Sequence, residues 1–506
     1  MTFPVLRKVL IANRGEIARR IISACHELGA SAVAVYSDVD KDAPWVWEAD
    51  EAYPLHGSTA ADTYLNSEKI LNIAVNHGVD AIHPGYGFLS ENADFAAACA
   101  RRGLVFVGPP PEAMHALGSK AAARALAQAH DVPVVPGVDG AGRSDDELAD
   151  AAHAIGYPVL IKASAGGGGK GMRVVDDSGE LSDALRAARQ EAQSAFGDPH
   201  VLLEKYFTQI HHVEVQVLGD AHGNLLHLYE RECSIQRRHQ KIIEESPSPV
   251  VGDDETLREA ITAAAVRLAR AAGYSSAGTV EFIVDSTGGF YFLEMNTRLQ
   301  VEHPVTESVT GIDLVTWQLR VAAGEPLSFA QHDVRRRGHA IECRVYAEDP
   351  ATGFLPSIGE IVYYGRPTGP GLRVDDGIES GSAVSPYYDP MLAKVITWGA
   401  ERREAIRKME RALRETAVLG VTTNIDYLRD ILAQPAFIAG HTSTNFLAEH
   451  MAGWQPPVEA SEDEWIAAAA YEILSAMNAG PATAATGGQP VYDPWEAARG
   501  WRNVGA

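Results

Sequence analysis

Cysteine is scarce in this sequence, and the few cysteines stand far apart. No Cys-x-x-Cys pair occurs, which excludes a disulfide framework and a cysteine-ligated zinc site and is typical of a reducing compartment. We therefore expect a cytoplasmic protein. The four cysteines are Cys25, Cys99, Cys233 and Cys343.

Positive charge is also in short supply. Lys and Arg number 43 against 67 Asp and Glu, so the formal net charge is −24. A nucleic-acid-binding protein needs a basic face, which disfavours that class. No apolar run approaches the length of a membrane span, and the Met-Thr-Phe-Pro start lacks the apolar stretch of a signal peptide. We expect a protein that binds neither nucleic acid nor membranes.

The N-terminal part of the sequence does contain an alternation of strand and helix patterns. Residues 8–12 and 31–36 are apolar strands, and residues 16–28 between them have apolar positions at helical spacing. Such alternation indicates a parallel sheet in an α/β domain. A composition that is 46% hydrophobic over 506 residues is sufficient for about three domains.

A cluster of polar residues follows a buried strand pattern near residue 294. Residues 289–293 are apolar and aromatic, and residues 294–304 then read Glu-Met-Asn-Thr-Arg-Leu-Gln-Val-Glu-His-Pro. If the strand continues, its period of two places five polar side chains on one face, which is costly unless they bind something. The mixture of residue types disfavours the alternative, a solvated edge strand. The five residues are Glu294, Asn296, Arg298, Gln300 and Glu302.

A β-hairpin is predicted around the loop Ser286–Gly289, just before this cluster. Closing the loop with Asp285 opposite Phe290 places Glu281 directly opposite Glu294. Facing carboxylates repel each other, and a divalent cation between them removes the repulsion. Oxygen ligands suit Mg²⁺ (or Mn²⁺), which is typical of nucleotide chemistry. The predicted metal ligands are Glu281, Glu294 and Asn296.

A glycine-rich loop follows another strand pattern. The apolar run 158–161 ends in Lys162, and the loop contains four consecutive glycines, Gly166–Gly169, followed by Lys170. Consecutive glycines let backbone amides turn toward an anion, and the two lysines suit a triphosphate. A flexible linker is the alternative. No Ser or Thr follows Lys170, which excludes the P-loop pattern, and residues 12–18 do not fit the dinucleotide fingerprint.

A third cluster, residues 230–241, is rich in charge and taken alone is typical of a solvated face. Together with the two clusters above, with Lys-Val-Leu-Ile-Ala-Asn-Arg-Gly-Glu-Ile at 8–17 and with His-Pro-Gly-Tyr-Gly-Phe-Leu-Ser-Glu at 83–91, it resembles the biotin carboxylase family of the ATP-grasp superfamily. The resemblance covers about residues 5–450. It implies that ATP, bicarbonate and biotin are converted to ADP, phosphate and N-carboxybiotin.

The resemblance implies a multidomain fold of the α/β and α+β classes. A Rossmann-like N-terminal domain is followed by an ATP-grasp domain with its lid, by a C-terminal biotin carboxylase domain and by a helical and flexible tail. The predicted boundaries are 1–119, 120–334 with the lid at about 132–206, 335–452 and 453–506.

The resemblance also implies an ATP site. The lid glycines close over the phosphates, which lysines and Mg²⁺ neutralise. Glu204, Lys205 and Phe207 match an adenine-binding hinge, and His212, Gln236 and His239 match contacts to the ribose and phosphates. For each of the last three residues, an ordinary polar surface position is the alternative. The matching residues are Lys120, Lys162, Gly166, Gly167, Gly168, Gly169, Glu204, Lys205, Phe207, His212, Gln236 and His239.

For bicarbonate, a guanidinium offers paired hydrogen bonds and an ammonium adds charge, which Arg298 and Lys241 provide. Glu302 matches the general base that deprotonates bicarbonate. Arg344 matches the residue that stabilises the enolate-like oxygen of biotin. Further matching positions are Gln300 and Val301 around bicarbonate, and Tyr86 and Asp389 near biotin.

The C-terminal segment differs in composition. Ser461-x-x-Glu464 is a capping box that predicts a helix to about residue 476, and residues 480–488 are typical of a flexible linker. Residues 493–501 resemble the segment that follows biotin carboxylase domains in the α chains of acyl-CoA carboxylases. We interpret the tail either as a docking element or as a remnant of a longer chain.

The expected partners follow from the same resemblance. Biotinyl carrier domains contain Ala-Met-Lys-Met, which does not occur in this sequence. Lys408-Met409 lies in a charged helical pattern, residues 402–413. We therefore expect biotin to be a substrate on a separate biotin carboxyl carrier protein, without covalent attachment to this chain. The other expected partners are a second copy of the chain, in a homodimer, and a carboxyltransferase subunit.

Two other functions compete with this interpretation. A carbamoyl phosphate synthetase-like ligase also phosphorylates bicarbonate, but it is internally duplicated, whereas this sequence has one Glu-Met-Asn-x-Arg segment. A non-catalytic ATP-binding regulatory subunit is disfavoured because relatives without activity usually lose the base or a metal ligand. Here Glu281, Glu294, Arg298, Glu302 and Arg344 are all present.

Overall fold

The structure, a computed structural model, describes residues 6–163, 172–196, 199–238, 240–456 and 462–478. Two compact units divide the chain, Met1–Trp454 and Gln455–Ala506. All the predicted site residues fall in the first unit. The predicted domain boundaries inside that unit stay a prediction.

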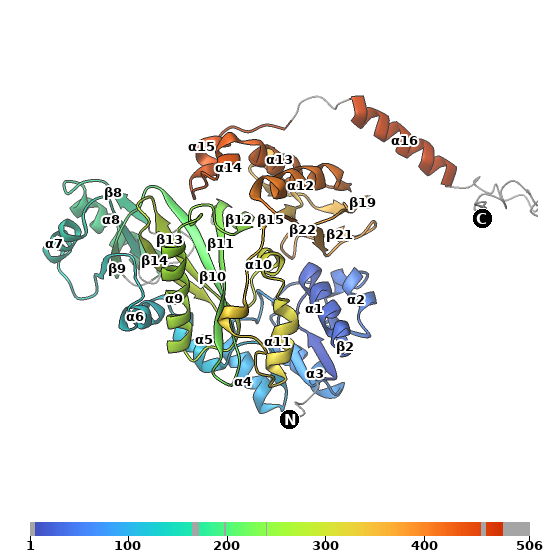
Figure 1. The fold of residues 1–506 in the computed structure, drawn as a ribbon, viewed down its shortest axis with the longest axis horizontal. Coiled ribbons are helices and arrows are strands. Elements are labelled where there is room, and N and C mark those ends of the chain that lie inside the picture. Colours follow the sequence, from blue (N-terminus) through green and yellow to red (C-terminus); the bar gives the residue numbers. More distant parts are fainter. Residues whose placement is uncertain (1–5, 164–171, 197–198, 239, 457–461, 479–506) are drawn as a thin grey trace, which may run out of the picture. The chain divides into compact units, whose positions relative to one another are not determined.

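A five-stranded parallel sheet in the order β3-β2-β1-β4-β5 forms the N-terminal part, which Figure 1 draws in blue. This confirms the parallel sheet predicted from the strand and helix patterns. Helix α1 follows β1 directly and buries Ile17, Ile21 and Cys25 on one face, as its spacing predicts. The elements are β1 (Lys8–Ile11), α1 (Gly15–Glu27), β2 (Ser31–Tyr36), α2 (Pro44–Glu48), β3 (Glu51–Pro54), α3 (Ser67–Asn76), β4 (Ala81–His83), α4 (Ala93–Arg101), β5 (Val105–Phe106) and α5 (Pro111–Gly118).

A smaller four-stranded antiparallel sheet, in the order β6-β9-β7-β8, lies within the predicted lid. Its apolar side chains, such as Leu148, Val159 and Leu203, form a separate buried cluster with α7 and α8. The strand predicted to end at Lys162 ends at Ala163. The elements are α6 (Lys120–Ala129), β6 (Gly137–Asp139), α7 (Asp145–Ile155), β7 (Val159–Ala163), β8 (Arg173–Val175), α8 (Leu181–Phe196) and β9 (Val201–Lys205).

An eight-stranded antiparallel sheet, in the order β14-β13-β10-β11-β12-β15-β22-β20, carries most of the predicted site. Pairing of β12 with β15 makes the sheet continuous across the predicted boundary at residues 334 and 335. Its strands are β10 (Ile210–Gly219), β11 (Leu225–Arg237), β12 (Gln240–Ser246), β13 (Ser276–Asp285), β14 (Phe290–Asn296), β15 (His339–Tyr346), β20 (Leu372–Asp376) and β22 (Met391–Gly399).

Helices pack against this sheet, and several short strands precede or follow its strands β20 and β22 in the sequence. Helix α10 packs against β11, β12 and β15 (Figure 1). The remaining elements are α9 (Glu255–Ala271), α10 (His303–Thr310), α11 (Leu314–Ala322), β16 (Glu348–Asp349), β17 (Leu355–Pro356), β18 (Gly359–Glu360), β19 (Tyr363–Gly365), β21 (Ala383–Val384), α12 (Arg402–Glu415), β23 (Ala417–Leu419), α13 (Ile425–Ala433), α14 (Pro435–Ala439) and α15 (Phe446–His450).

The β13–β14 hairpin confirms that Glu281 faces Glu294, but the predicted closing pair is wrong. Phe290 pairs with Val284 rather than with Asp285. The Asp285 carboxylate accepts hydrogen bonds from the backbone N–H groups of Thr287 and Gly289, at 2.8 and 2.9 Å, which tightens the turn by one residue. A β-bulge at Leu293 then restores the register, so the two deviations cancel.

The five polar residues were predicted to share one face because the strand was expected to continue, and that expectation is wrong. Strand β14 ends at Asn296, and α10 begins at His303 with Glu302 as its N-cap. Residues 297–302 therefore form a connecting loop. Contacts with residues outside that loop, and not strand periodicity, determine where Arg298, Gln300 and Glu302 point.

The second unit contains α16 (Glu462–Asn478), which confirms the helix predicted in the tail. Ser461, half of the predicted capping box, and residues 480–501 lie outside the described residues. Apolar side chains of α16 such as Trp465 and Ile466 are exposed. Among the helices of the described residues, none is both long and apolar enough to cross a membrane.

Candidate active site

Lys241 joins three carboxylates that come from different elements. Its Nζ lies 2.6 Å from Glu214 on β10, 3.1 Å from Glu281 on β13 and 2.6 Å from Glu302 at the start of α10. The three carboxylates are buried, so the lysine compensates charge that water does not reach. Burial lowers the pKa of Lys241, but the carboxylates outweigh burial and raise this pKa well above its ordinary value.

Glu302 lies between two cations. One carboxylate oxygen contacts Lys241, and the other accepts a hydrogen bond from Nη2 of Arg344 at 3.0 Å. Burial raises the pKa of Glu302, but Lys241, Arg344 and Arg231 together hold it well below its ordinary value. Glu302 is therefore ionised at neutral pH and can accept a proton once an anionic ligand draws these cations away from it.

Arg231 on β11 connects the segments that carry this cluster. It is fully buried, and all five of its guanidinium N–H groups have acceptors at 2.8 to 3.1 Å. Because the acceptors come from β10, β13, α10 and the loop before it, one side chain fixes four segments. The acceptors are Glu214, Gln216, Thr279, Gln300 and Thr306.

Glu281, one of the predicted metal ligands, is surrounded by hydrogen-bond donors. His212 Nε2 lies 2.8 Å from its carboxylate, and the side-chain amides of Asn296 and Gln300 donate to it at 2.7 and 2.8 Å. Burial raises the pKa of Glu281, but Lys241 and His212 hold it well below its ordinary value. An ionised carboxylate beside an amide suits a hard cation.

Glu294 is less enclosed than its partner. Its side chain is 39% exposed, and Lys120 Nζ lies 3.6 Å away. The structure thus brings Glu281, Glu294 and Asn296 to adjacent positions of one hairpin, with Lys120 beside them. Their oxygen-rich donor set fits a site for Mg²⁺ that also admits a phosphate.

If the facing carboxylates hold Mg²⁺, then Glu281→Gln and Glu294→Gln should each raise the Mg²⁺ concentration needed for half-maximal turnover. A neutral amide is a poorer ligand for a divalent cation than a carboxylate. A metal titration of both variants checks this, with the partly exposed Glu325, which pairs with Arg320, changed to Gln as the matched control. Titration curves that match the parent protein for both variants would refute this metal site.

The predicted ATP residues at the lid lie partly together. Lys162 on β7 and Arg124 on α6 both form ion pairs with Glu204 on β9. Lys205, by contrast, donates to the backbone carbonyls of Gly156 and Tyr157, at 2.9 Å each. This contact holds a turn of the lid, a use that the sequence pattern did not indicate.

Further residues predicted to bind ATP lie on strands of the large sheet or next to them. Phe207 stacks on Tyr291 with 5.0 Å between ring centroids. Gln236 Nε2 lies 3.2 Å from Nδ1 of His212. Gly166, Gly167, Gly168, Gly169 and His239 lie outside the described residues.

Arg298 does not reach Lys241 or Glu302 but is held at the edge of the cluster. Its Nε donates to Glu91 at 3.1 Å, and its Nη2 donates to Asn296 at 3.0 Å. Glu91 ends the 83–91 segment on which the family resemblance rests. The backbone of Val301 is held by Lys394, whose Nζ donates to the Val301 carbonyl at 2.9 Å.

The two residues predicted near biotin come from different segments, Tyr86 after β4 and Asp389 before β22. The Tyr86 hydroxyl donates to Glu16 on α1. Asp389 is exposed, accepts a hydrogen bond from the Met391 backbone N–H at 2.9 Å, and lines a small cavity with Arg14 and Tyr388. Sequence reasoning assigned no role to Glu214, Arg231, Glu244, Glu342 or Lys394, which the structure places around the predicted catalytic residues.

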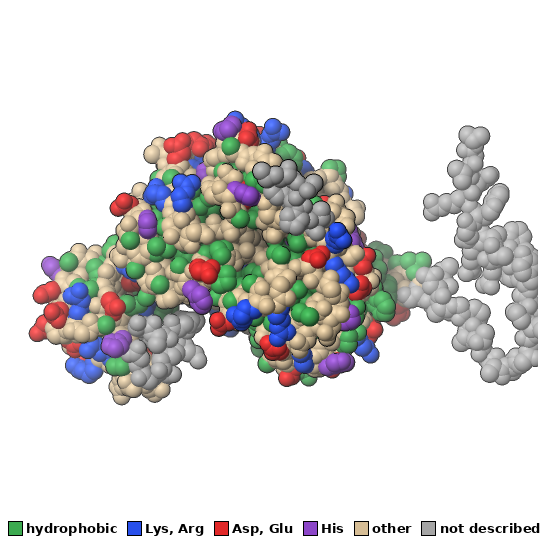
Figure 2. Space-filling model, turned by 90° about the horizontal axis from the view of Figure 1, so that it is seen from below, with side chains coloured by type: hydrophobic (Ala, Val, Ile, Leu, Met, Phe, Trp, Pro, Cys, Tyr) green, Lys and Arg blue, Asp and Glu red, His purple; other side chains and the backbone are tan. Residues whose placement is uncertain are grey.

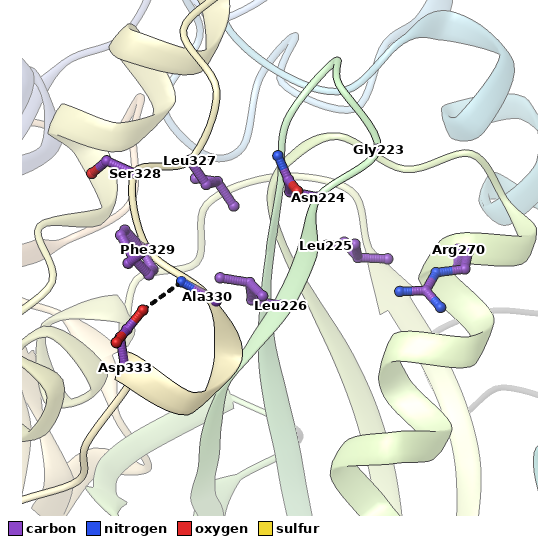
Figure 3. A pocket seen from close by; sticks show the side chains of 10 residues that line it. All are labelled: Gly223, Asn224, Leu225, Leu226, Arg270, Leu327, Ser328, Phe329, Ala330 and Asp333. Atoms are coloured by element: carbon purple, nitrogen blue, oxygen red, sulfur yellow. Dashed lines mark hydrogen bonds between the residues drawn. The ribbon is translucent and has the colours of Figure 1, made fainter.

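A larger, open cavity of about 530 Å³ lies at the β10–β11 turn, away from these residues (Figure 3). Leu225, Leu226 and Phe329 give it an apolar wall, and Arg270 stands at its rim. None of the predicted site residues lines it. On the face drawn in Figure 2, acidic and basic side chains are mixed rather than gathered by sign.

Three family models match the chain in sequence. Residues 5–114 match the biotin carboxylase N-terminal domain, residues 119–330 match the ATP-binding domain of the carbamoyl-phosphate synthase L chain, and residues 342–449 match the biotin carboxylase C-terminal domain. Together these models cover most of the chain.

Curated relatives and solved structures agree with the family models. A biotin carboxylase of Halalkalibacterium halodurans is 51% identical over 88% of this chain and 98% of its own length. The alpha chain of mitochondrial methylcrotonoyl-CoA carboxylase from Dictyostelium discoideum is 47% identical over 93% of this chain and 67% of its own length.

The biotin carboxylase domain of 2-oxoglutarate carboxylase from Hydrogenobacter thermophilus was solved as a dimer with MgADP, ADP and bicarbonate. It superimposes with a TM-score of 0.82 at 46% identity, covering 90% of this chain and all of that one. Family models, relatives and fold agree with the cluster around Lys241 and Glu302: this chain belongs to the biotin carboxylase family.

Proposed function

We propose that this chain carboxylates biotin with ATP and bicarbonate, through carboxyphosphate, as the first half-reaction of an acyl-CoA carboxylase. The observation that carries the proposal is the buried cluster in which Lys241 contacts Glu214, Glu281 and Glu302 while Arg344 contacts Glu302. Such a cluster combines a base, cations for small anions and a metal ligand in one place.

ATP binds, in this proposal, between the lid and the large sheet. Lys120 and Lys162 neutralise phosphate charge, and the lid glycines Gly166–Gly169 close over the phosphates. The adenine and ribose contacts come from Glu204, Lys205, Phe207, His212, Gln236 and His239. Mg²⁺ held by Glu281, Glu294 and Asn296 would supply Lewis-acid polarisation of the phosphates.

Bicarbonate would bind beside Glu302. Arg298 and Lys241 provide charge, and Gln300 and the Val301 backbone N–H provide further hydrogen bonds. Glu302 takes the proton of bicarbonate as its oxygen attacks the γ-phosphorus, and the bond between that phosphorus and ADP breaks. Because the anion shares Lys241 with Glu302, its binding raises the pKa of Glu302 toward that of a useful base.

Carboxyphosphate then breaks down to CO₂ and phosphate. The phosphate takes the proton from the ureido nitrogen of biotin, and that nitrogen attacks CO₂ to give N-carboxybiotin. Arg344 stabilises the negative charge that develops on the ureido oxygen. Tyr86 and Asp389 are proposed to lie near biotin.

The partners in this proposal are a biotin carboxyl carrier protein, a second copy of the chain and a carboxyltransferase subunit. Relatives of similar identity carry the names of enzymes with different acceptors: chains of the propionyl-CoA carboxylase of Sus scrofa and the pyruvate carboxylase of Methanothermobacter thermautotrophicus are 52% and 50% identical. We therefore assign acceptor choice to the carboxyltransferase. A cytoplasmic location and the absence of nucleic-acid partners stay predictions.

The alternatives are less well supported. The family model shared with carbamoyl-phosphate synthase covers only residues 119–330, and biotin carboxylase models flank it on both sides. A non-catalytic subunit has no need of a buried, ionised glutamate between two cations, which is costly to assemble.

ADP release should require bicarbonate and should rise further with free biotin. The test omits each component in turn from an assay with ATP and Mg²⁺, after an avidin blot has shown whether biotin is already attached to the protein. Turnover indifferent to both bicarbonate and biotin would overturn the assignment. A biotinylated chain would overturn only the claim of a separate carrier.

A further inference from the structure

Two buried glutamates stand behind Arg344 and have no role in the mechanism above. Glu244 on β12 and Glu342 on β15 are cross-strand partners in the antiparallel register, and both are 0% exposed. Side chains at such facing positions have their Cβ atoms about 4.5–5.5 Å apart, so the two carboxyl groups are neighbours.

The contacts of the two glutamates are unequal. Glu244 accepts a hydrogen bond from Nε of Arg344 at 2.5 Å through one oxygen. Its other oxygen, and both oxygens of Glu342, are buried without a hydrogen-bond partner among the described residues. A buried carboxylate without donors is costly, whereas a buried carboxylic acid costs less and can itself donate.

The surrounding charges do not remove this cost. Lys394 on β22 is the cation that interacts most strongly with Glu342, but its Nζ already contacts Glu16 at 3.0 Å and the Val301 carbonyl. The charged groups around the pair are Arg344, Lys394, Lys241 and Glu302, with Glu16 and Asp375 beyond Lys394.

We propose that Glu244 and Glu342 share one proton, so that the pair positions Arg344 with a single negative charge and leaves its cationic face toward the reacting oxygen. Two facing carboxyl groups in a dry site cannot both ionise without large repulsion. If both were ionised, Arg344 would meet three carboxylates, Glu244, Glu302 and Glu342, and its stabilisation of an oxyanion would weaken.

The pKa shifts agree with this geometry. Burial raises the pKa of Glu244 to about 7, because Arg344 only partly offsets burial and Glu302 adds to it. Burial, and then the charge of Glu244, raises the pKa of Glu342 well above its ordinary value. Both residues are positioning residues, since they act through Arg344, and their role in turnover rests on the proposed function.

The test compares Glu342→Gln with the parent protein and with Glu360→Gln, an exposed glutamate on β18 of the same unit. Gln imitates the protonated form, so turnover of Glu342→Gln should persist at alkaline pH, its alkaline limb moving upward by about one pH unit or more. Glu244→Gln should instead raise the KM for biotin, because Arg344 loses its charged acceptor. Superimposed pH profiles of parent and Glu342→Gln would overturn the proposal.

A second measurement does not depend on turnover. The unfolded chain ionises Glu342 near its ordinary pKa while the folded protein keeps the proton, so the parent loses stability as pH rises above that value. Glu342→Gln should therefore have a higher Tm than the parent at pH 8, and the difference should vanish toward pH 4. Infrared difference spectra at neutral pH should show a protonated carboxyl in the parent that the variant lacks.

These readouts separate the two hypotheses. If the parent protein shows no bicarbonate- and biotin-dependent turnover, the proposed function is refuted. The shared proton is then judged by the Tm values and the infrared spectra. A Tm difference independent of pH, or no carboxyl band assigned to Glu342, would overturn the shared proton while the proposed function stands.

Discussion

Replacing Glu302 by Gln is expected to lower kcat by about 10²- to 10⁴-fold, the usual range for loss of a general base, with little change in ATP affinity. Gln preserves the shape of the side chain but cannot accept a proton from bicarbonate. Glu302 is 2% exposed and lies 2.6 Å from Lys241, so no water replaces it easily as a base. Steady-state kinetics at saturating ATP and bicarbonate measure the effect.

The matched control for this variant is Glu325→Gln, whose carboxylate pairs with Arg320 away from the cluster. This control should keep the kcat of the parent protein. Nucleotide affinity, measured by titration calorimetry, distinguishes a chemical defect from a folding defect in Glu302→Gln. An unchanged kcat would remove Glu302 from the role of base.

Replacing Arg231 by Leu is expected to lower the free energy of unfolding by about 3–5 kcal/mol, because it removes the guanidinium that pairs with the fully buried Glu214. The five acceptors of its guanidinium also lose their donors, including Gln300 in the loop that leads to Glu302. Thermal and urea unfolding of the purified variant measure the loss. Turnover should fall as well, because the loop before α10 loses its anchor.

The control is Arg186→Leu on α8, whose ion pair with Asp183 is exposed. Surface pairs of this kind contribute about 0–1 kcal/mol, so this variant should unfold close to the parent. If Arg231→Leu were as stable as the parent, the cluster would not depend on the buried guanidinium, and the interpretation of Arg231 as its anchor would be wrong.

Local patterns in the sequence were sufficient for the elements that obey local rules. The apolar stripe of residues 16–28 predicted α1, and the alternation around it predicted the parallel sheet. The facing pair Glu281 and Glu294 was also predicted, although a tighter turn at Asp285 and a bulge at Leu293 had to cancel for this to hold. Side-chain capping by Asp285 and a bulge have no simple periodic signature.

Long-range contacts explain what sequence patterns left out. Lys241 is separated by 27, 40 and 61 residues from its three carboxylates, so no local spacing reveals that they meet. Arg231 belonged to a cluster that alone is typical of a solvated face, yet it is fully buried. Glu342 had no predicted role, because its significance depends on the β12–β15 register.

That register also has a consequence for synthesis on the ribosome. β12 ends at Ser246, whereas its sheet neighbour β15 begins at His339, so the edge of β12 remains open until that later segment has been translated. Open strand edges favour pairing with the wrong chain. Slow or interrupted translation after β12 thus exposes an unpaired strand edge of the nascent chain, which favours aggregation. A chaperone that covers this edge would protect β12, the strand that carries Lys241, until β15 can pair with it.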